Sequence, residues 1–355
     1  MNYAVVLAGG TGERFWPAST PLRPKQLLPL LSDRTLLRET VDRLDGVVSP
    51  ERTMVLTHAT LVDEVARELP EVPRGNVIGE PEGKNTAPAV GLAAGLLEAR
   101  DPDAVFLALP ADHAVGDVDA FRDSVQGAFQ LAAERALLVL FGIVPSRPET
   151  GYGYVRRGEP LDVTTVEAYE VAAFLEKPDA ETVRRLWNDG RHYWNSGLFC
   201  GRASVFLEEY GRHLPLMRKT VQAAVTGWDE GPRRSLERFY ATVESTSIDY
   251  GIMQQTDRAA VLPASDWGWD DVGSWDALAR WMELDARGNV AVGDVELEEC
   301  TDLVAWSESG RISALGLSDV VVVRTIDETL VVSRERLDDL KAFVRSVTGR
   351  KEAGR

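Results

Sequence analysis

Apolar residues in the first half of the chain alternate between short unbroken runs and helix-spaced patterns. The unbroken runs predict strands buried on both faces, and they occupy residues 3–8, 53–57, 77–79, 104–109 and 137–143. Between the runs, residues 36–44 and 87–99 place apolar side chains at helical spacing. Strands that alternate with helices in this way predict βαβ units and a mostly parallel sheet.

The pattern changes in the second half of the chain. It is mixed from residue 169 to about 206, helix-rich to about 256, and from 288 onward it consists of short β-branched runs between turn residues. A helix is predicted at 334–347. We therefore predict an α/β fold with a Rossmann-like mixed, mostly parallel sheet flanked by helices. A large domain would occupy residues 1–285, and a small β-rich domain ending in a helix would occupy 286–355.

Charge and composition narrow the class of protein. The chain has 56 acidic and 39 basic residues, a net charge of −17, and no lysine- or arginine-rich run, so no nucleic-acid partner is predicted. No apolar run approaches the ~20 residues of a membrane span, and the N-terminus resembles a core strand rather than a signal peptide. Cys200 and Cys300 have neither metal nor redox spacing. These features predict a cytoplasmic protein with no membrane association.

A glycine-rich loop directly after the first strand is the strongest chemical signal. Gly9, Gly10 and Gly12 allow backbone N–H groups to approach phosphates, and Arg14 and Lys25 add positive charge. No Gly-Lys-Ser/Thr follows, so the loop is not a Walker A motif. The dinucleotide fingerprint is also excluded, because Phe15 stands where its third glycine belongs. The loop is therefore predicted to bind a polyphosphate through its backbone N–H groups and its two cations, in a pattern that differs from both of these motifs.

The full pattern, GG-x-G-x-R-x-x-P-x-(S/T) followed by P-K-Q-x-L-x-L, resembles the signature of the sugar-1-phosphate nucleotidyltransferases. Trp16-Pro17 and Lys25-Gln26 are most similar to the mannose-1-phosphate guanylyltransferase branch. This resemblance implies that mannose 1-phosphate and GTP condense to GDP-mannose and pyrophosphate by in-line attack on the α-phosphate. It also implies a β-helix-like C-terminal domain, a homodimer through that domain, and transferase activity alone, because the isomerase-type domain of fused members is not expected.

The resemblance assigns roles to residues of the loop and of one later segment. Arg14, Lys25 and Lys177 would be catalytic, holding phosphate groups of the two substrates. Nucleotide-binding roles fall to Leu7, Ala8, Gly9, Gly10 and Gly12 in the loop, and to Glu80, Asn85 and Thr86 in a Glu-Pro-Glu-Gly-Lys-Asn-Thr segment.

Two aspartates are candidate ligands of Mg²⁺. Asp112 follows the apolar strand that ends near Leu109, where ligands of open α/β sheets bind. Asp271 lies in Gly-Trp-Asp-Asp-Val-Gly-Ser-Trp. Mg²⁺ is commonly held by one or two carboxylates together with substrate phosphates, so this pair suits it, and the resemblance assigns both to the metal. Asp270 offers a second carboxylate beside Asp271, and residue type alone does not separate the two.

The sugar and the base have separate candidate residues. Glu176 closes a strand ahead of Lys177 and Pro178, and the resemblance places it, with Gly153 and Asn195, at the sugar hydroxyls. Glu80 is predicted to read guanine, since a carboxylate can accept from both N1–H and the exocyclic amine. Uracil and thymine offer a single imide donor and would leave the carboxylate unsatisfied.

Three alternatives stay open beside this prediction. The first is the same reaction with glucose 1-phosphate and UTP or dTTP, which Glu80 and Trp16-Pro17 disfavour. The second is a catalytically silent nucleotide-sugar sensor or regulator, which would be expected to have lost some of the charged residues. The third, a nicotinamide dehydrogenase, is disfavoured by the spacing of the loop glycines.

Overall fold

The computed structural model describes residues 1–10, 12–163, 166–187, 189–264 and 267–353. Contacts between these residues divide the chain into two compact units. Unit 1 comprises Met1–Gly9, Thr40–Ala111 and Val115–Trp269, and unit 2 comprises Gly10–Glu39, Asp112–Ala114 and Asp270–Arg355. The two units are interleaved in the sequence, so the glycine-rich loop continues from one into the other between Gly9 and Gly10.

Unit 1 is built on a nine-stranded sheet with the order β3-β2-β1-β4-β9-β6-β10-β8-β7. The first four strands in this order are parallel, whereas β9 runs antiparallel to β4 and β6. The strands are β1 (Asn2–Ala8), β2 (Thr53–His58), β3 (Val77–Glu80), β4 (Val105–Pro110), β6 (Leu138–Ile143), β7 (Tyr154–Pro160), β8 (Tyr169–Leu175), β9 (His192–Arg202) and β10 (Ala259–Pro263).

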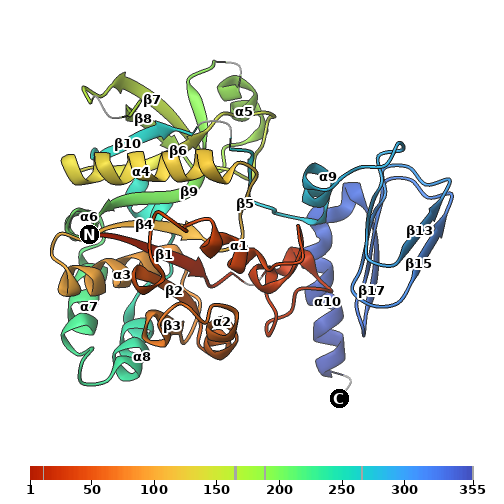
Figure 1. Ribbon diagram of the computed structural model, residues 1–355, viewed down its shortest axis with the longest axis horizontal. Coiled ribbons are helices and arrows are strands. Elements are labelled where there is room, and N and C mark those ends of the chain that lie inside the picture. Colours follow the sequence, from red (N-terminus) through yellow and green to blue (C-terminus); the bar gives the residue numbers. More distant parts are fainter. Residues whose placement is uncertain (11, 164–165, 188, 265–266, 354–355) are drawn as a thin grey trace. The chain divides into compact units, whose positions relative to one another are not determined.

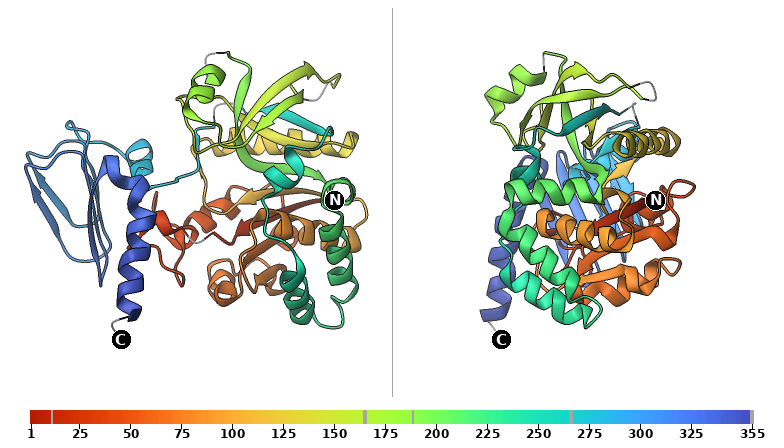
Figure 2. Two further views of the ribbon diagram at one scale, coloured as in Figure 1. Left: turned by 180° about the vertical axis from the view of Figure 1, so that it is seen from behind. Right: turned by 90° about the vertical axis from the view of Figure 1, so that its left-hand side faces the viewer.

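Helices cover both faces of this sheet. In Figure 1, α4 lies on one side of β4 and β9, and α3 and α7 lie on the other. Figure 2 shows α7 and α8, in green and teal, side by side. The helices are α1 (Leu36–Asp42), α2 (Val62–Glu68), α3 (Thr86–Arg100), α4 (Val118–Glu134), α5 (Ala180–Trp187), α6 (Ala203–His213), α7 (Pro215–Thr226) and α8 (Pro232–Thr242), with a π-helix at Asp249–Met253.

Unit 2 contains the C-terminal strands and the greater part of the glycine-rich loop. Its parallel pairs β12–β14–β16 and β13–β15 repeat along the chain as β-helix-like coils, and β17 closes the first sheet in antiparallel fashion. The elements are β12 (Val290–Val292), β13 (Val295–Glu298), β14 (Val304–Ser307), β15 (Ile312–Leu315), β16 (Val320–Arg324), β17 (Thr329–Ser333), α9 (Leu278–Trp281) and α10 (Leu340–Ala353). The two-residue strands β5 (Ala114–Val115) and β11 (Trp269–Asp270) pair with each other.

One apolar core joins the loop residues of unit 2 to its C-terminal strands. Phe15 and Trp275 are fully buried, with ring centroids 4.9 Å apart, and the Trp306 ring lies 5.5 Å from that of Trp275. The indole Nε1 of Trp275 donates to the carbonyl of Trp16 at 3.1 Å. The conformation of the glycine-rich loop therefore depends on side chains that lie more than ~250 positions later in the sequence.

The predicted fold class is confirmed: an α/β sheet flanked by helices and a C-terminal β-helix-like part. The large sheet is mixed rather than mostly parallel, because β7, β8 and β9 pair with their neighbours in antiparallel fashion. The predicted terminal helix begins as a 3₁₀ turn at Arg334–Asp339, and α10 starts only at Leu340. The division between residues 285 and 286 stays a prediction. No helix within the described ranges is long and apolar enough to cross a membrane.

Candidate functional site

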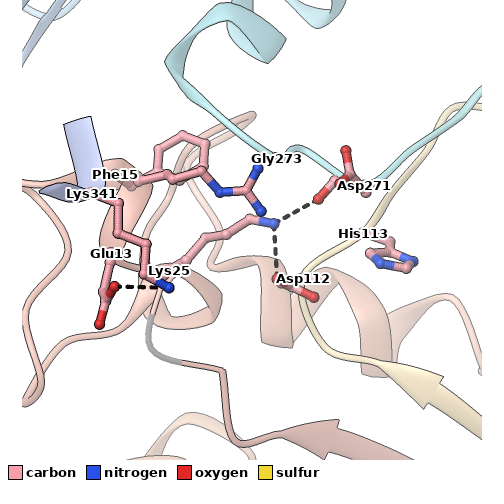
Figure 3. A pocket seen from close by; sticks show the side chains of 10 residues that line it. Glu13, Phe15, Lys25, Asp112, His113, Asp271, Gly273 and Lys341 are labelled. Carbon is pink, nitrogen blue, oxygen red and sulfur yellow. Dashed lines mark hydrogen bonds and ion pairs between the residues drawn. The ribbon is translucent and has the colours of Figure 1, made fainter. Parts of the chain in front are cut away.

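A polar pocket lies entirely within unit 2 (Figure 3). It collects residues from four distant stretches of the chain: the glycine-rich loop, the turn after β4, the turn after β11, and α10. Its lining residues are Gly12, Glu13, Arg14, Phe15, Lys25, Asp112, His113, Asp271, Gly273 and Lys341. Four of the predicted site residues therefore line one pocket with Gly12: the two cations Arg14 and Lys25 and the two aspartates.

The backbone at Gly12 shapes the loop side of the pocket. Its φ of +61° is left-handed, and a Cβ there would stand 2.5 Å from the Cβ of Lys25, so a larger residue has no room. Gly12 precedes a 3₁₀ turn at Glu13–Phe15, which directs Phe15 into the core and leaves Arg14 on the pocket. The Gln26 side chain bonds the Gly10 carbonyl at 3.2 Å. The loop is thus held by the bond from Gln26 to Gly10 and by the close approach of Gly12 to Lys25.

Lys25 is a buried cation at the centre of the pocket. Its Nζ donates to Asp112 Oδ2 at 2.8 Å and to the Asp271 carbonyl oxygen at 2.6 Å, as the dashed lines in Figure 3 mark. The ammonium also lies 5.8 Å from the centroid of the Phe15 ring. These three contacts hold the charge in place, as electrostatic catalysis requires.

Arg14 differs from Lys25 in its bonding. Within the described part of the chain its guanidinium forms no hydrogen bond or ion pair, although it lines the pocket close to Gly273. An arginine in this state presents its planar set of donors to whatever anion enters the pocket.

The two aspartates of the pocket suit a hard divalent cation. Burial alone would raise the pKa of Asp112, but the charges of Lys25 and His113 and the bond from Lys25 hold that pKa below its ordinary value. Asp112 is therefore ionised at neutral pH. Asp112 and Asp271 offer oxygen ligands only, and no group of three or more His, Cys, Asp or Glu suited to a metal occurs among the residues described. Such sparse coordination fits Mg²⁺ with substrate phosphates as further ligands.

The structure separates Asp270 from Asp271. Asp270 is 4% exposed, forms a bidentate pair with Arg280 (2.6 and 3.0 Å) and accepts from the Val272 backbone N–H at 2.7 Å. Asp271 lines the pocket instead. Asp270 thus shapes the turn that carries Asp271, and it is not a lining residue.

A substitution tests this division of roles. Asp270→Asn is expected to destabilise the fold by about 1–3 kcal/mol, because Arg280 and the Val272 N–H lose a charged acceptor. The Arg280 side chain is 33% exposed, which keeps the effect below that of a fully buried pair. Urea unfolding measures the loss. A variant as stable as wild type would contradict the structural role of Asp270.

A second group of predicted residues lies in unit 1, around Glu80. Its carboxylate is buried, accepts from the Tyr240 hydroxyl at 2.5 Å, and has Oε2 only 2.9 Å from the position that a Cβ on Gly9 would take. Burial raises the pKa of Glu80 to about 7, and the bond from Tyr240 opposes that rise. Leu7 and Ala8, the last residues of β1, precede Gly9.

Asn85 and Thr86 form the start of α3 in the same unit. Asn85 is the N-cap residue with φ +66°, and its side chain accepts from the Thr86 N–H at 2.9 Å. The Thr86 hydroxyl accepts from the Ile248 N–H at 2.9 Å, which ties the beginning of α3 to the π-helix region. Their nucleotide-binding roles stay predictions.

The three predicted sugar-binding residues come together in unit 1. A Cβ on Gly153 would stand 2.5 Å from Glu176 Oε2 and 3.2 Å from the Cβ of Asn195, so this close approach requires glycine. Lys177, the predicted phosphate ligand, is 59% exposed, pairs with Glu176 at 3.2 Å and has φ +47°. A left-handed lysine is strained, and such strain is concentrated at functional sites.

Asp249 belongs to this group and was not predicted from the sequence. It accepts from Asn195 Nδ2 at 2.8 Å, and burial raises its pKa. Burial first, and then the negative charge of Asp249, raise the pKa of Glu176 as well. Asp249 opens the π-helix, an element often found at functional sites. The available sequence signal was a carboxylate set in the apolar stretch Ile248–Met253.

Comparisons with known proteins agree with this geometry. The family model described as nucleotidyl transferase matches residues 3–288, and that described as the mannoseP isomerase/GMP-like β-helix domain matches 283–347. The mannose-1-phosphate guanylyltransferase ManC of Salmonella typhimurium is 42% identical over 97% of this chain and 73% of its own length. A mannose-1-phosphate guanylyltransferase of Escherichia coli K12 is 41% identical with the same coverage.

A solved structure covers nearly all of both chains. It is a crystal structure named as mannose-1-phosphate geranyltransferase from Thermus thermophilus, 35% identical, with a TM-score of 0.87 over 98% of this chain and 99% of that one. The match extends through the glycine-rich loop and the C-terminal coils.

Proposed function

Because the chain belongs to the nucleotidyl transferase family, in its mannose-1-phosphate guanylyltransferase branch, we propose that it transfers the guanylyl group of GTP to mannose 1-phosphate. GDP-mannose and pyrophosphate would be the products. The single observation that carries this proposal is the pocket of unit 2, where Arg14, Lys25, Asp112 and Asp271 are brought together from distant parts of the sequence. A catalytically silent sensor would be expected to have lost some of these charged residues.

The reaction needs no general base, because its nucleophile is already a phosphate anion. The oxygen of mannose 1-phosphate attacks the α-phosphorus of GTP in line, a new P–O bond forms, and the bond to the leaving pyrophosphate breaks. The contribution of the protein is positioning and neutralisation of developing charge. Backbone N–H groups of the Gly9–Gly12 loop and Arg14 would hold the triphosphate, and Lys25 would lie by the α-phosphate.

Asp112 and Asp271 would hold Mg²⁺ in this scheme. When bound, the ion neutralises phosphate charge and fixes the relative orientation of the phosphoryl groups. Lys25 bonds the Asp112 carboxylate and the Asp271 backbone, so it would hold both aspartates in position to bind the ion. Lys177 would hold the phosphate of the sugar. Glu176 would accept hydrogen bonds from mannose hydroxyls, Asn195 would bond them through its amide, and Gly153 would allow the close approach of the backbone.

We assign guanine recognition to Glu80, and its pKa of about 7 makes the role testable by pH. Only the carboxylate accepts both guanine donors, and below pH 7 the carboxyl is increasingly neutral. We therefore expect kcat/KM for GTP to fall as pH drops through about 7, since that ratio reports groups of the free enzyme. Glu80→Gln is expected to lower kcat/KM for GTP about tenfold or more and to abolish this acidic limb.

Titration of GTP itself affects wild type and variant alike, so the difference between their pH profiles isolates Glu80. Use of GTP and UTP is compared at each pH. An unchanged preference for GTP in Glu80→Gln, with an unchanged pH profile, would remove Glu80 from base recognition.

The proposed function is tested by pyrophosphate release with each pairing of GTP, UTP or dTTP with mannose or glucose 1-phosphate, with and without Mg²⁺. GTP with mannose 1-phosphate and Mg²⁺ is expected to be the best pair. Preference for glucose 1-phosphate with UTP or dTTP would favour the uridylyl- or thymidylyltransferase alternative. No turnover with any pair would favour a nucleotide-sugar sensor. We further propose a cytoplasmic location, and a homodimer through the C-terminal domain, as the resemblance implies.

A further inference from the structure

One cation of the pocket has no part in the scheme above. Lys341, on α10, lines the same pocket as Arg14 and Lys25, although it lies more than ~300 positions later in the chain. Its Nζ is 3.2 Å from Glu13 Oε2, a contact drawn as a dashed line in Figure 3. Its side chain is 54% exposed, so it can change position without unpacking a core.

Glu13 makes the position of Lys341 significant. It is a carboxylate on the lining of a pocket that would receive a highly negative triphosphate. Its negative charge would repel the phosphate groups. Two cations of α10 approach its Oε2, Lys341 at 3.2 Å and Arg345 at 3.6 Å. If Lys341 leaves, Arg345 still neutralises Glu13. Lys341 can therefore leave Glu13 without leaving that carboxylate unpaired.

Moving Lys341 from Glu13 to a phosphate group would cost little free energy. An ion pair with both partners partly exposed contributes only about 0–1 kcal/mol. A phosphate group carries more charge than a carboxylate and accepts strong charge-assisted hydrogen bonds from lysine. Lys25, by contrast, is buried and held by Asp112, so it is not available to move to the end of the triphosphate.

The base of α10 is fixed near the loop, which gives Lys341 a defined reach. The Phe343 and Trp16 rings pack edge-on with centroids 6.3 Å apart. Just before α10, Arg334 bonds Asp276 at 2.6 Å. Leu340 and Val344 are buried in the core of unit 2.

We propose that Lys341 binds the β- and γ-phosphates of the nucleotide, and hence the leaving pyrophosphate, by moving from Glu13 to the phosphate oxygens. The C-terminal helix then supplies a substrate-binding residue as well as packing. This inference rests on the proposed function, because it assigns Lys341 to one part of that substrate.

Pyrophosphorolysis of GDP-mannose separates this contact from a structural role. Lys341→Met is expected to raise the KM for pyrophosphate about tenfold to a hundredfold, the effect of one lost charged hydrogen bond, with an unchanged KM for GDP-mannose. Lys341→Arg is expected to restore most of the binding. Glu13→Gln is expected to lower the KM for pyrophosphate, because it removes the competing carboxylate.

Two variants serve as matched controls. Arg345→Met removes the other partner of Glu13 from the same helix, and Lys219→Met removes an exposed lysine of α7. Arg345→Met is expected to raise the KM for pyrophosphate by less than Lys341→Met, because it removes only the cation that neutralises Glu13 and no contact with the phosphates. Lys219→Met is expected to leave that KM unchanged. Equal effects of Lys341→Met and Arg345→Met, a parallel rise in the KM for GDP-mannose, or no change in Lys341→Met would each overturn the proposal.

Calorimetry with magnesium pyrophosphate alone gives a readout that does not depend on turnover. Wild type is expected to bind it more tightly than Lys341→Met. If wild type binds pyrophosphate but turns over no substrate pair, the proposed function fails while Lys341 is still tested. If wild type makes GDP-mannose and Lys341→Met binds pyrophosphate equally well, only the role of Lys341 fails.

Discussion

Asp271→Asn is expected to lower kcat for GDP-mannose formation by at least about a hundredfold, the scale of losing one charge-stabilising group in an active site. The substitution keeps the shape of the side chain but removes a charge that would hold Mg²⁺. The bond from Lys25 goes to the backbone carbonyl of Asp271, so the variant retains it. The fold is therefore expected to keep nearly its full stability.

Asp270→Asn is the matched control for this experiment, because it is the same chemical change one residue earlier. It is expected to reduce stability through Arg280 and to leave kcat of the folded enzyme close to wild type. Steady-state rates at several Mg²⁺ concentrations, together with urea unfolding, measure both variants. If Asp270→Asn loses activity and Asp271→Asn does not, the metal assignment is wrong.

Trp275→Ala is expected to lower the free energy of unfolding by about 3–5 kcal/mol, as for other large aromatic residues removed from a core. Trp275 is fully buried, and its ring packs against those of Phe15 and Trp306. Its loss also leaves the Trp16 carbonyl without its donor. Activity is expected to fall with it, because Phe15 packs beneath Lys25 in the pocket.

Trp187→Ala provides the comparison, since Trp187 is 42% exposed on α5. It is expected to change stability by much less than Trp275→Ala. Urea unfolding followed by circular dichroism measures both variants. A loss below about 1 kcal/mol in Trp275→Ala would mean that the loop and the C-terminal strands do not depend on this shared core.

The elements of unit 1 could be predicted well from local pattern. The runs at 53–57 and 77–79 become β2 and β3 with bounds shifted by only one residue, because a continuous apolar run between turn signals leaves few other structures. The glycine-rich loop was found for a similar reason. Its glycines, arginine and lysine lie within one short connection, so no long-range contact was needed to see them.

The residues that were missed depend on contacts far apart in the sequence. Lys341 has the pattern of an ordinary exposed helix residue, and only the packing of α10 on the loop brings it to the pocket. Asp249 stands within an apolar stretch, and only its hydrogen bond with Asn195 places it among the predicted sugar-binding residues. Asp270 and Asp271, by contrast, were both named, but they are chemically identical neighbours, and only the contact of Asp270 with Arg280 distinguishes it from Asp271 on the pocket.

³¹P NMR of purified protein incubated with GTP, mannose 1-phosphate and Mg²⁺ follows the proposed guanylyl transfer directly. We predict that GDP-mannose and pyrophosphate appear in equal amounts, and that neither appears when Mg²⁺ is chelated. Hydrolysis of GTP without GDP-mannose, or no change in either substrate, would contradict the claim that this chain is a guanylyltransferase acting on mannose 1-phosphate.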